Sequence, residues 1–87
     1  MRELSKNDWR VLAELLEMAS ESSIKHGVDE FKLDNTKENL ELVVSAELWD
    51  CPNDPCPANI DKDDNQIYTD DSFLMRFFAS IARENSQ

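Results

Sequence analysis

Apolar side chains recur at helical spacing in three separate stretches, and this periodicity constrains the fold more than any other feature of the sequence. In the first stretch, Trp9, Leu12, Leu16, Ala19 and Ser23 follow one another at intervals of three or four residues. This spacing puts them on one face of a helix, with the polar residues between them on the other. The stretch therefore predicts an amphipathic helix.

Both ends of this first helix carry recognisable signals. Ser5 with Asp8 three residues later is typical of a capping box at a helix start. Gly27, the single glycine of the chain, can adopt the positive φ with which many helices end. Lys25 and His26 just before it complement the negative end of the helix dipole. We expect a helix over about 7–26.

The second stretch follows a short extended link in which Phe31 and Leu33 point the same way. Asn35 and Glu38 form a start signal for a helix over about 36–49. Its apolar positions keep a helical period: Leu40, Val43, Val44 and Leu48. A strand is the alternative, because residues 40–43 alternate, but the alternation fails at Val43 and Val44.

The third stretch predicts a helix over about 71–84 that is rich in aromatic side chains. One line of this helix holds Phe73, Phe77 and Ile81, with Leu74, Phe78 and Ala82 beside it. If the first and third helices close over the second, Trp9 and Trp49 can bury against the phenylalanines.

Residues 50–70 lack such periodicity and are dominated by Asp, Asn and Pro. Only Ile67 to Thr69 could form a short extended piece, after a turn at Asp63 to Asn65. A connection of this length is unusual in a compact domain and often functional. With 87 residues there is room for one core. We expect a single, mainly α domain of three helices with a long acidic, proline-containing loop between the second and third.

The formal net charge of −10 is concentrated in the middle of the chain. Residues 27–72 hold thirteen acidic against three basic side chains. This excess disfavours direct binding to nucleic acid or to anionic membranes and favours a basic or nucleic-acid-binding protein as partner. No stretch is apolar for the length of a membrane span. The candidate partner-binding residues are Asp50, Asp54, Asp61, Asp63, Asp64, Asp70 and Asp71.

Two cysteines, Cys51 and Cys56, flank the sequence PNDP. A structural zinc site needs further nitrogen or sulfur ligands, and the chain has one histidine and no third cysteine. A disulfide requires the prolines to fold the segment back on itself. We expect a cytoplasmic protein with reduced thiols and no cofactor, and the state of the two cysteines stays open.

A calcium site is the other metal site that the sequence pattern suggests. Asp61, Asp63 and Asn65 stand at the first, third and fifth positions of an EF-hand-like loop. Gln66 replaces the glycine of the sharp turn, and Ser72 replaces the bidentate glutamate at position twelve. The segment is better interpreted as an acidic turn before a helix, and no metal site is predicted.

The sequence contains no recognisable catalytic motif. The lone histidine, His26, lies at a predicted helix end, and one glycine cannot build a phosphate-binding loop. In length, acidity and lack of catalytic motifs the chain resembles the small inhibitory proteins of phages and mobile elements, including DNA mimics and anti-CRISPR or anti-restriction proteins.

That resemblance implies a non-enzymatic inhibitor that occupies a basic nucleic-acid-binding surface on a target protein. Two alternatives remain. One is a metal-responsive regulatory module ordered by calcium or zinc, and the other is a structural or regulatory subunit that docks through apolar helix faces. The sequence leaves the oligomeric state open.

Overall fold

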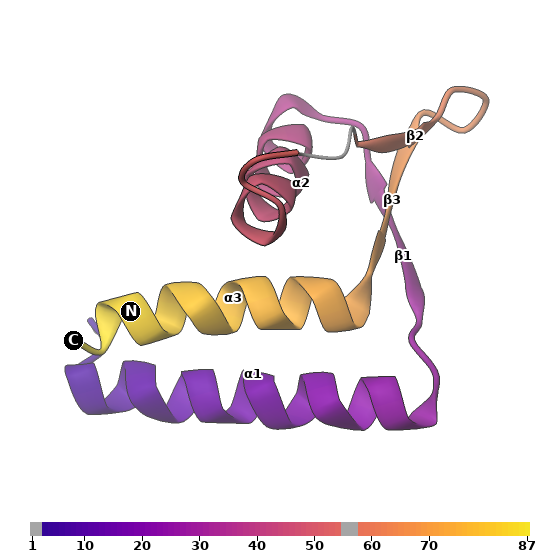
Figure 1. Cartoon of the computed structure of the whole chain (residues 1–87). Helices are drawn as coiled ribbons and strands as arrows, with labels where there is room; N and C mark the ends of the chain where they lie inside the picture. Colours follow the sequence, from indigo (N-terminus) through magenta and orange to yellow (C-terminus); the bar gives the residue numbers. More distant parts are fainter. Residues whose placement is uncertain (1–2, 55–57) are drawn as a thin grey trace.

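The computed structural model describes residues 3–54 and 58–87. Three helices and three strands follow one another along the chain (Figure 1). In order they are α1 (Lys6–His26), β1 (Glu30–Asp34), α2 (Lys37–Asp50), β2 (Asn59–Asp61), β3 (Gln66–Asp70) and α3 (Asp71–Asn85). Within the described residues, no helix is both long and apolar enough to cross a bilayer.

The predicted start and end of α1 are confirmed. Ser5 Oγ accepts a hydrogen bond from the Asp8 backbone N–H at 3.1 Å, and Asp8 Oδ2 accepts one from the Ser5 N–H at 3.0 Å. This reciprocal pair satisfies two N–H groups that the helix itself leaves unbonded. Gly27 follows the last helical residue with φ of +99°, a conformation that other residues rarely adopt.

A helix over the second apolar stretch is also confirmed, but its cap lies one residue later than predicted. Thr36 Oγ1 accepts from the Asn39 N–H at 3.2 Å and is the N-cap of α2. Asn35 instead bonds to Asn65, through backbone N–H to carbonyl at 3.1 Å and side chain to side chain at 3.2 Å. Asn35 thus joins the start of α2 to the turn between β2 and β3.

The extended piece predicted at Ile67 to Thr69 is part of β3, but the rest of the predicted loop over 50–70 is not all irregular, because the segment supplies two strands, β2 and β3. They join β1, the expected extended link, in an antiparallel sheet of order β1-β3-β2. Leu33 and Ile60 both lie opposite Ile67, one from each neighbouring strand. The alternation in Gln66–Asp70 buries Ile67 and Thr69. β3 pairs with β1 along its whole length and with β2 over its first three residues.

The helices pack differently from the predicted arrangement. α1 and α3 lie side by side and antiparallel, and α2 packs on α3 and β3 instead of being covered by the other two helices (Figure 1). Small buried residues line the contact of the long helices: Ala13 and Ser20 of α1, and Ala79 and Ala82 of α3. Small side chains allow the two backbones to approach closely.

Of the two tryptophans, Trp49 is the one for which the described residues show ring contacts with phenylalanines. The Trp49 ring lies 5.7 Å from that of Phe77 and 6.4 Å from that of Phe73, measured between centroids. These contacts attach the end of α2 to α3. Ile67 of β3 and Val43 of α2 are the largest fully buried side chains among the described residues.

Candidate functional site: an acidic pocket

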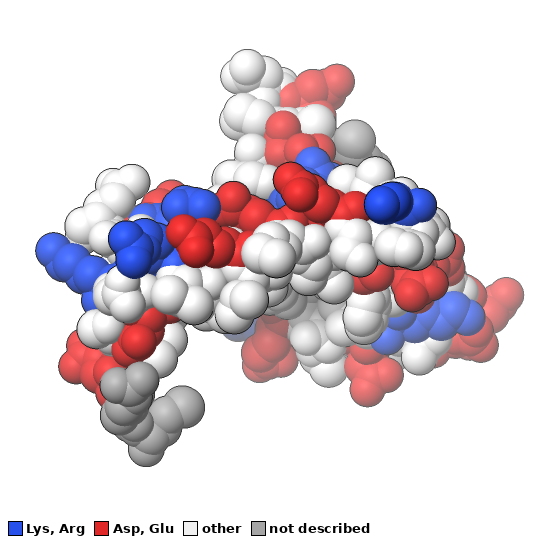
Figure 2. All heavy atoms as spheres, turned by 90° about the horizontal axis from the view of Figure 1, so that it is seen from below, with Lys and Arg blue, Asp and Glu red and all other residues white. Residues whose placement is uncertain are grey.

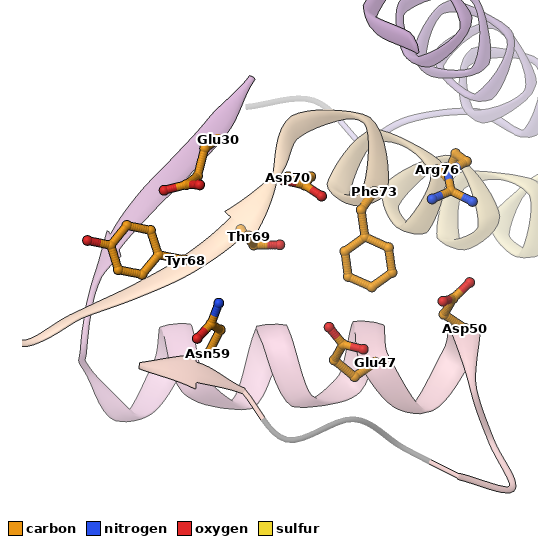
Figure 3. A pocket seen from close by; sticks show the side chains of 9 residues that line it. All are labelled: Glu30, Glu47, Asp50, Asn59, Tyr68, Thr69, Asp70, Phe73 and Arg76. Carbon is orange, nitrogen blue, oxygen red and sulfur yellow. The ribbon is translucent and has the colours of Figure 1, made fainter. Parts of the chain in front are cut away.

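A polar pocket of about 370 Å³ lies where the end of α2, the sheet and the start of α3 meet (Figure 3). Five elements contribute to its wall. The lining residues are Glu30, Glu47, Asp50, Asn59, Tyr68, Thr69, Asp70, Phe73 and Arg76. Four carboxylates and one guanidinium therefore share the pocket, a formal excess of three negative charges.

Two of these carboxylates come from the last turn of α2. Glu47 and Asp50 are three residues apart, which puts them on the same face of a helix, and both point into the pocket in Figure 3. The last turn holds no basic residue. Since the C-terminal end of a helix is itself negative, the dipole of α2 adds to the negative potential of the two side chains.

The other two carboxylates belong to residues that are paired on adjacent strands. Glu30 of β1 lies directly opposite Asp70 of β3 in the antiparallel register. Like charges in opposed positions destabilise a sheet. This opposition lies in the wall of the pocket, and a cation bound there would relieve it.

Arg76 is the one basic side chain in the wall, and it does not neutralise the pocket. Its guanidinium carbon lies 5.9 Å from the centre of the Phe73 ring, a cation–π arrangement. No carboxylate of the described residues comes within 4 Å of it to form an ion pair. Arg76 also lines a second hollow of about 270 Å³ together with Trp49 and the Glu17–Arg83 ion pair, so it stands between two depressions.

The structure divides the predicted partner-binding residues into groups. Asp50 and Asp70 lie in the pocket. Asp63 and Asp64 are exposed in the turn between β2 and β3, which projects away from the helices in Figure 1. Asp54 is exposed in the segment after α2.

Asp61 supports the hairpin turn. Its Oδ1 accepts from the backbone N–H groups of Asp63 at 2.9 Å and Asp64 at 3.4 Å, and its Oδ2 accepts from the Tyr68 hydroxyl at 2.8 Å. These bonds, that of Tyr68 above all, hold the pKa of Asp61 below its ordinary value. The same contact raises the pKa of Tyr68. Asp61 therefore shapes the turn that presents its neighbours.

Asp71 does not belong to an exposed surface, contrary to expectation. It is only 8% exposed, because β3 runs into α3 without a loop and carries it between α1 and the start of β1. Its Oδ1 accepts from Ser23 Oγ at 2.8 Å, from the Asp29 N–H at 3.1 Å and from the Ser72 N–H at 2.6 Å. Asp71 joins three segments and is a structural residue.

The described residues hold no group of three or more His, Cys, Asp and Glu side chains in a metal-binding arrangement. The segment that resembled a calcium loop forms the β2–β3 hairpin, in which Asp61 bonds internally. Cys51 follows α2, where its backbone N–H donates to the Glu47 carbonyl at 2.8 Å. Cys56 lies outside the described residues, so the bridge and zinc alternatives that involve it do too.

Sequence reasoning missed Glu30, Glu47 and Arg76. A signal existed for Glu47, whose spacing from Asp50 puts both on one helix face. None existed for Glu30, because its place opposite Asp70 depends on pairing between segments forty residues apart. No family model, curated protein or solved structure matches this chain.

Proposed function

We propose that this chain is a small acidic inhibitor that binds a basic protein and covers that protein's nucleic-acid-binding surface. The observation that carries the proposal is that most of the negative excess lies in residues 28–70, here called the acidic half. This segment holds twelve acidic against three basic side chains. α1 and α3, here called the helix pair, hold six against five. A localised excess attracts and orients a basic surface before contact.

The acidic pocket is suited to a lysine or arginine side chain of such a partner. Four carboxylates around one opening allow several charge-assisted hydrogen bonds to a single guanidinium or ammonium group. Binding a cation there also relieves the opposition of Glu30 and Asp70. The gain from binding is therefore larger than for carboxylates spread over a flat surface.

The hairpin turn offers a second contact on the acidic half. Asp63 and Asp64 are exposed there, and Asp61 fixes the turn by its bonds to their backbone N–H groups. A fixed turn loses little conformational entropy when it binds. The pocket and the turn together form the surface that we assign to the basic partner.

The first experiment uses a labelled octa-arginine peptide as a probe and measures its binding by fluorescence anisotropy at low salt. The triple variant Glu47→Gln, Asp50→Asn, Asp70→Asn should bind the peptide much more weakly than the wild type, because it removes three of the four pocket carboxylates. Circular dichroism checks that the variant stays folded.

The matched control removes three acids from outside the acidic half instead, through Glu3→Gln, Glu21→Gln and Glu84→Gln. It makes the net charge less negative by the same amount and should weaken peptide binding far less. Equal losses in the two variants would mean that total charge alone attracts the peptide and that the pocket has no special part.

The second experiment addresses the inhibitor role. Proteins captured by the wild type from the cell of origin, but not by the pocket variant, should include nucleic-acid-binding proteins. Each should release its nucleic acid when the wild type is added. Partners that bind this chain and nucleic acid at the same time would contradict the proposal.

A further inference from the structure

The outer side of α1 carries apolar residues that no part of the chain described by the structure covers. Leu4, Val11, Leu15 and Met18, here called the outer stripe, follow one another at spacings of seven, four and three. Leu15 is 57% and Met18 65% exposed. Ala13 and Ser20, which lie on the opposite side of the same helix, are buried. α1 is therefore apolar on two faces, and only one of them meets α3.

The outer stripe forms a shallow groove rather than a scatter of single side chains. A depression of about 280 Å³ is lined by Leu4, Val11, Leu15, the adjacent Leu12 and Asp8. Figure 2 views the molecule from this side, where uncharged surface lies beside a row of acidic side chains. Apolar positions at spacings of three and four over three turns are typical of a helix that packs against another helix.

We propose that the outer stripe is the contact between two copies of this chain, whose α1 helices pack antiparallel. A two-fold contact requires a surface that is complementary to itself. The register that sets Val11 of one copy against Leu15 of the other meets this condition at the centre of the stripe, because the same apolar pair then occurs twice, once on each side of the two-fold axis. In this register Arg10 lies within one turn of Glu14 of the second copy, on both sides of the axis.

Charge placement favours a second copy with this orientation. α1 holds four acidic and three basic side chains, so the contact itself is nearly neutral. The sheet rises from the C-terminal end of α1 in Figure 1. Antiparallel packing puts the two sheets at opposite ends of a 21-residue helix, roughly 30 Å apart. Parallel packing would bring two strongly acidic regions together and set Asp8 against Asp8.

The test is the solution mass of the full chain without any partner, measured by sedimentation equilibrium over low to high micromolar concentrations. The wild type should shift from the monomer mass of 10.1 kDa towards twice that value as concentration rises. Leu15→Glu and Met18→Glu, both at exposed positions, should remain monomeric and folded by circular dichroism. A wild type that stays monomeric throughout overturns the proposal.

Val44→Glu is the matched control, because Val44 is 42% exposed but lies on α2. It should dimerise like the wild type. If it disrupts the dimer as strongly as Leu15→Glu, the contact is not the outer stripe.

Charge reversal tests the orientation. Arg10→Glu and Glu14→Arg should each weaken the dimer several-fold, and the two changes combined should restore it, because each new acid again meets a new base. Failure of the combined variant to recover would overturn the antiparallel register. Arg10 also donates to Asn7 Oδ1 at 2.6 Å within its own helix, and the combined variant separates that local loss from the contact between copies.

Discussion

The helix pair and the acidic half achieve their structure by different means. In the helix pair, small side chains such as Ala79 and Ala82 are buried along a long contact, and Arg83 holds Glu17 through two hydrogen bonds of 2.6 and 3.1 Å. The acidic half has two large fully buried side chains, Ile67 and Val43, and most of its charges lack a counter-charge.

This difference shows where a small protein can carry a large net charge. Self-repulsion opposes the compact state, so an excess of acids spread over the whole chain would weaken every contact. Here the extensive packing of α1 on α3 is nearly neutral, and the excess lies on a sheet and helix attached to it. We propose different partners for the two regions, a basic protein for the acidic half and a second copy for the helix pair.

The largest expected effect comes from the aromatic contact that joins the two regions. Phe77 is buried on α3 and its ring meets that of Trp49 on α2. Phe77→Ala should lower the free energy of unfolding by about 3–5 kcal/mol, because it leaves a cavity in a small core. Denaturant titration measures the loss. Phe78→Ala, at a more exposed ring of the same helix, should cost clearly less, and equal losses would show that Phe77 has no special role in the junction.

The next effect is the response to salt, which should have opposite signs in the two regions. Octa-arginine binding to the acidic half should weaken by about tenfold or more between low and physiological salt, as the Debye length falls from about 30 Å to about 8 Å. Pairing of α1 helices should strengthen, because salt screens repulsion between the acidic halves. Parallel salt dependences of the two equilibria would mean that both use the same surface.

A smaller effect concerns Asp71, which connects the regions through buried hydrogen bonds. The Ser23 hydroxyl, together with the N–H groups of Ser72 and Asp29, lowers the pKa of Asp71 although burial opposes the shift. A folded-state pKa below the unfolded one stabilises the protein at neutral pH. That stabilisation is lost as the pH falls below about 4 and through the folded-state pKa.

Asp71→Asn should therefore lower the melting temperature at pH 7, and the difference from wild type should shrink as the pH falls below about 4. Thermal unfolding followed by circular dichroism over this pH range measures both. Asp63→Asn, at an exposed position of the hairpin turn, is the control and should show no such trend. A difference that is the same at every pH would mean that the charge of Asp71 does not contribute.

The smallest effect should be a gain in stability. Glu30→Gln removes the like-charge opposition with Asp70 and should raise the free energy of unfolding by about 0.2–1 kcal/mol. The same change should weaken octa-arginine binding, since it removes one of the four pocket carboxylates. A variant that is less stable than wild type would show that Glu30 makes a favourable contact in the folded protein.

The helices could be predicted from the sequence because their signals are local. The capping box of Ser5 and Asp8 spans four residues, and the end at Gly27 depends on one residue's φ. The sheet could not be predicted in the same way. β1 has five residues with two apolar positions, and its partner Gln66–Asp70 lies more than thirty residues away. The turn at Asp63 to Asn65 was the one local sign of a hairpin.

Only part of the candidate site could be predicted from the sequence, for the same reason. Composition identified the acidic segment, and Asp50 and Asp70 were named from it. Which carboxylates converge depends on how α2 sits against the sheet, so Glu47 and Glu30 were missed. Asp71 was misplaced because nothing in the sequence distinguishes an aspartate that bonds to Ser23 from its exposed neighbour Asp70.

The direct passage from β3 into α3 has a mechanical consequence. No residue separates Asp70 at the end of the strand from Asp71 at the start of the helix, and Asp71 is bonded to α1 and to the segment before β1. A pull on the hairpin turn is therefore not absorbed by a hinge at this point. A displacement of the hairpin is instead passed to the start of α3 and, through Asp71, to α1.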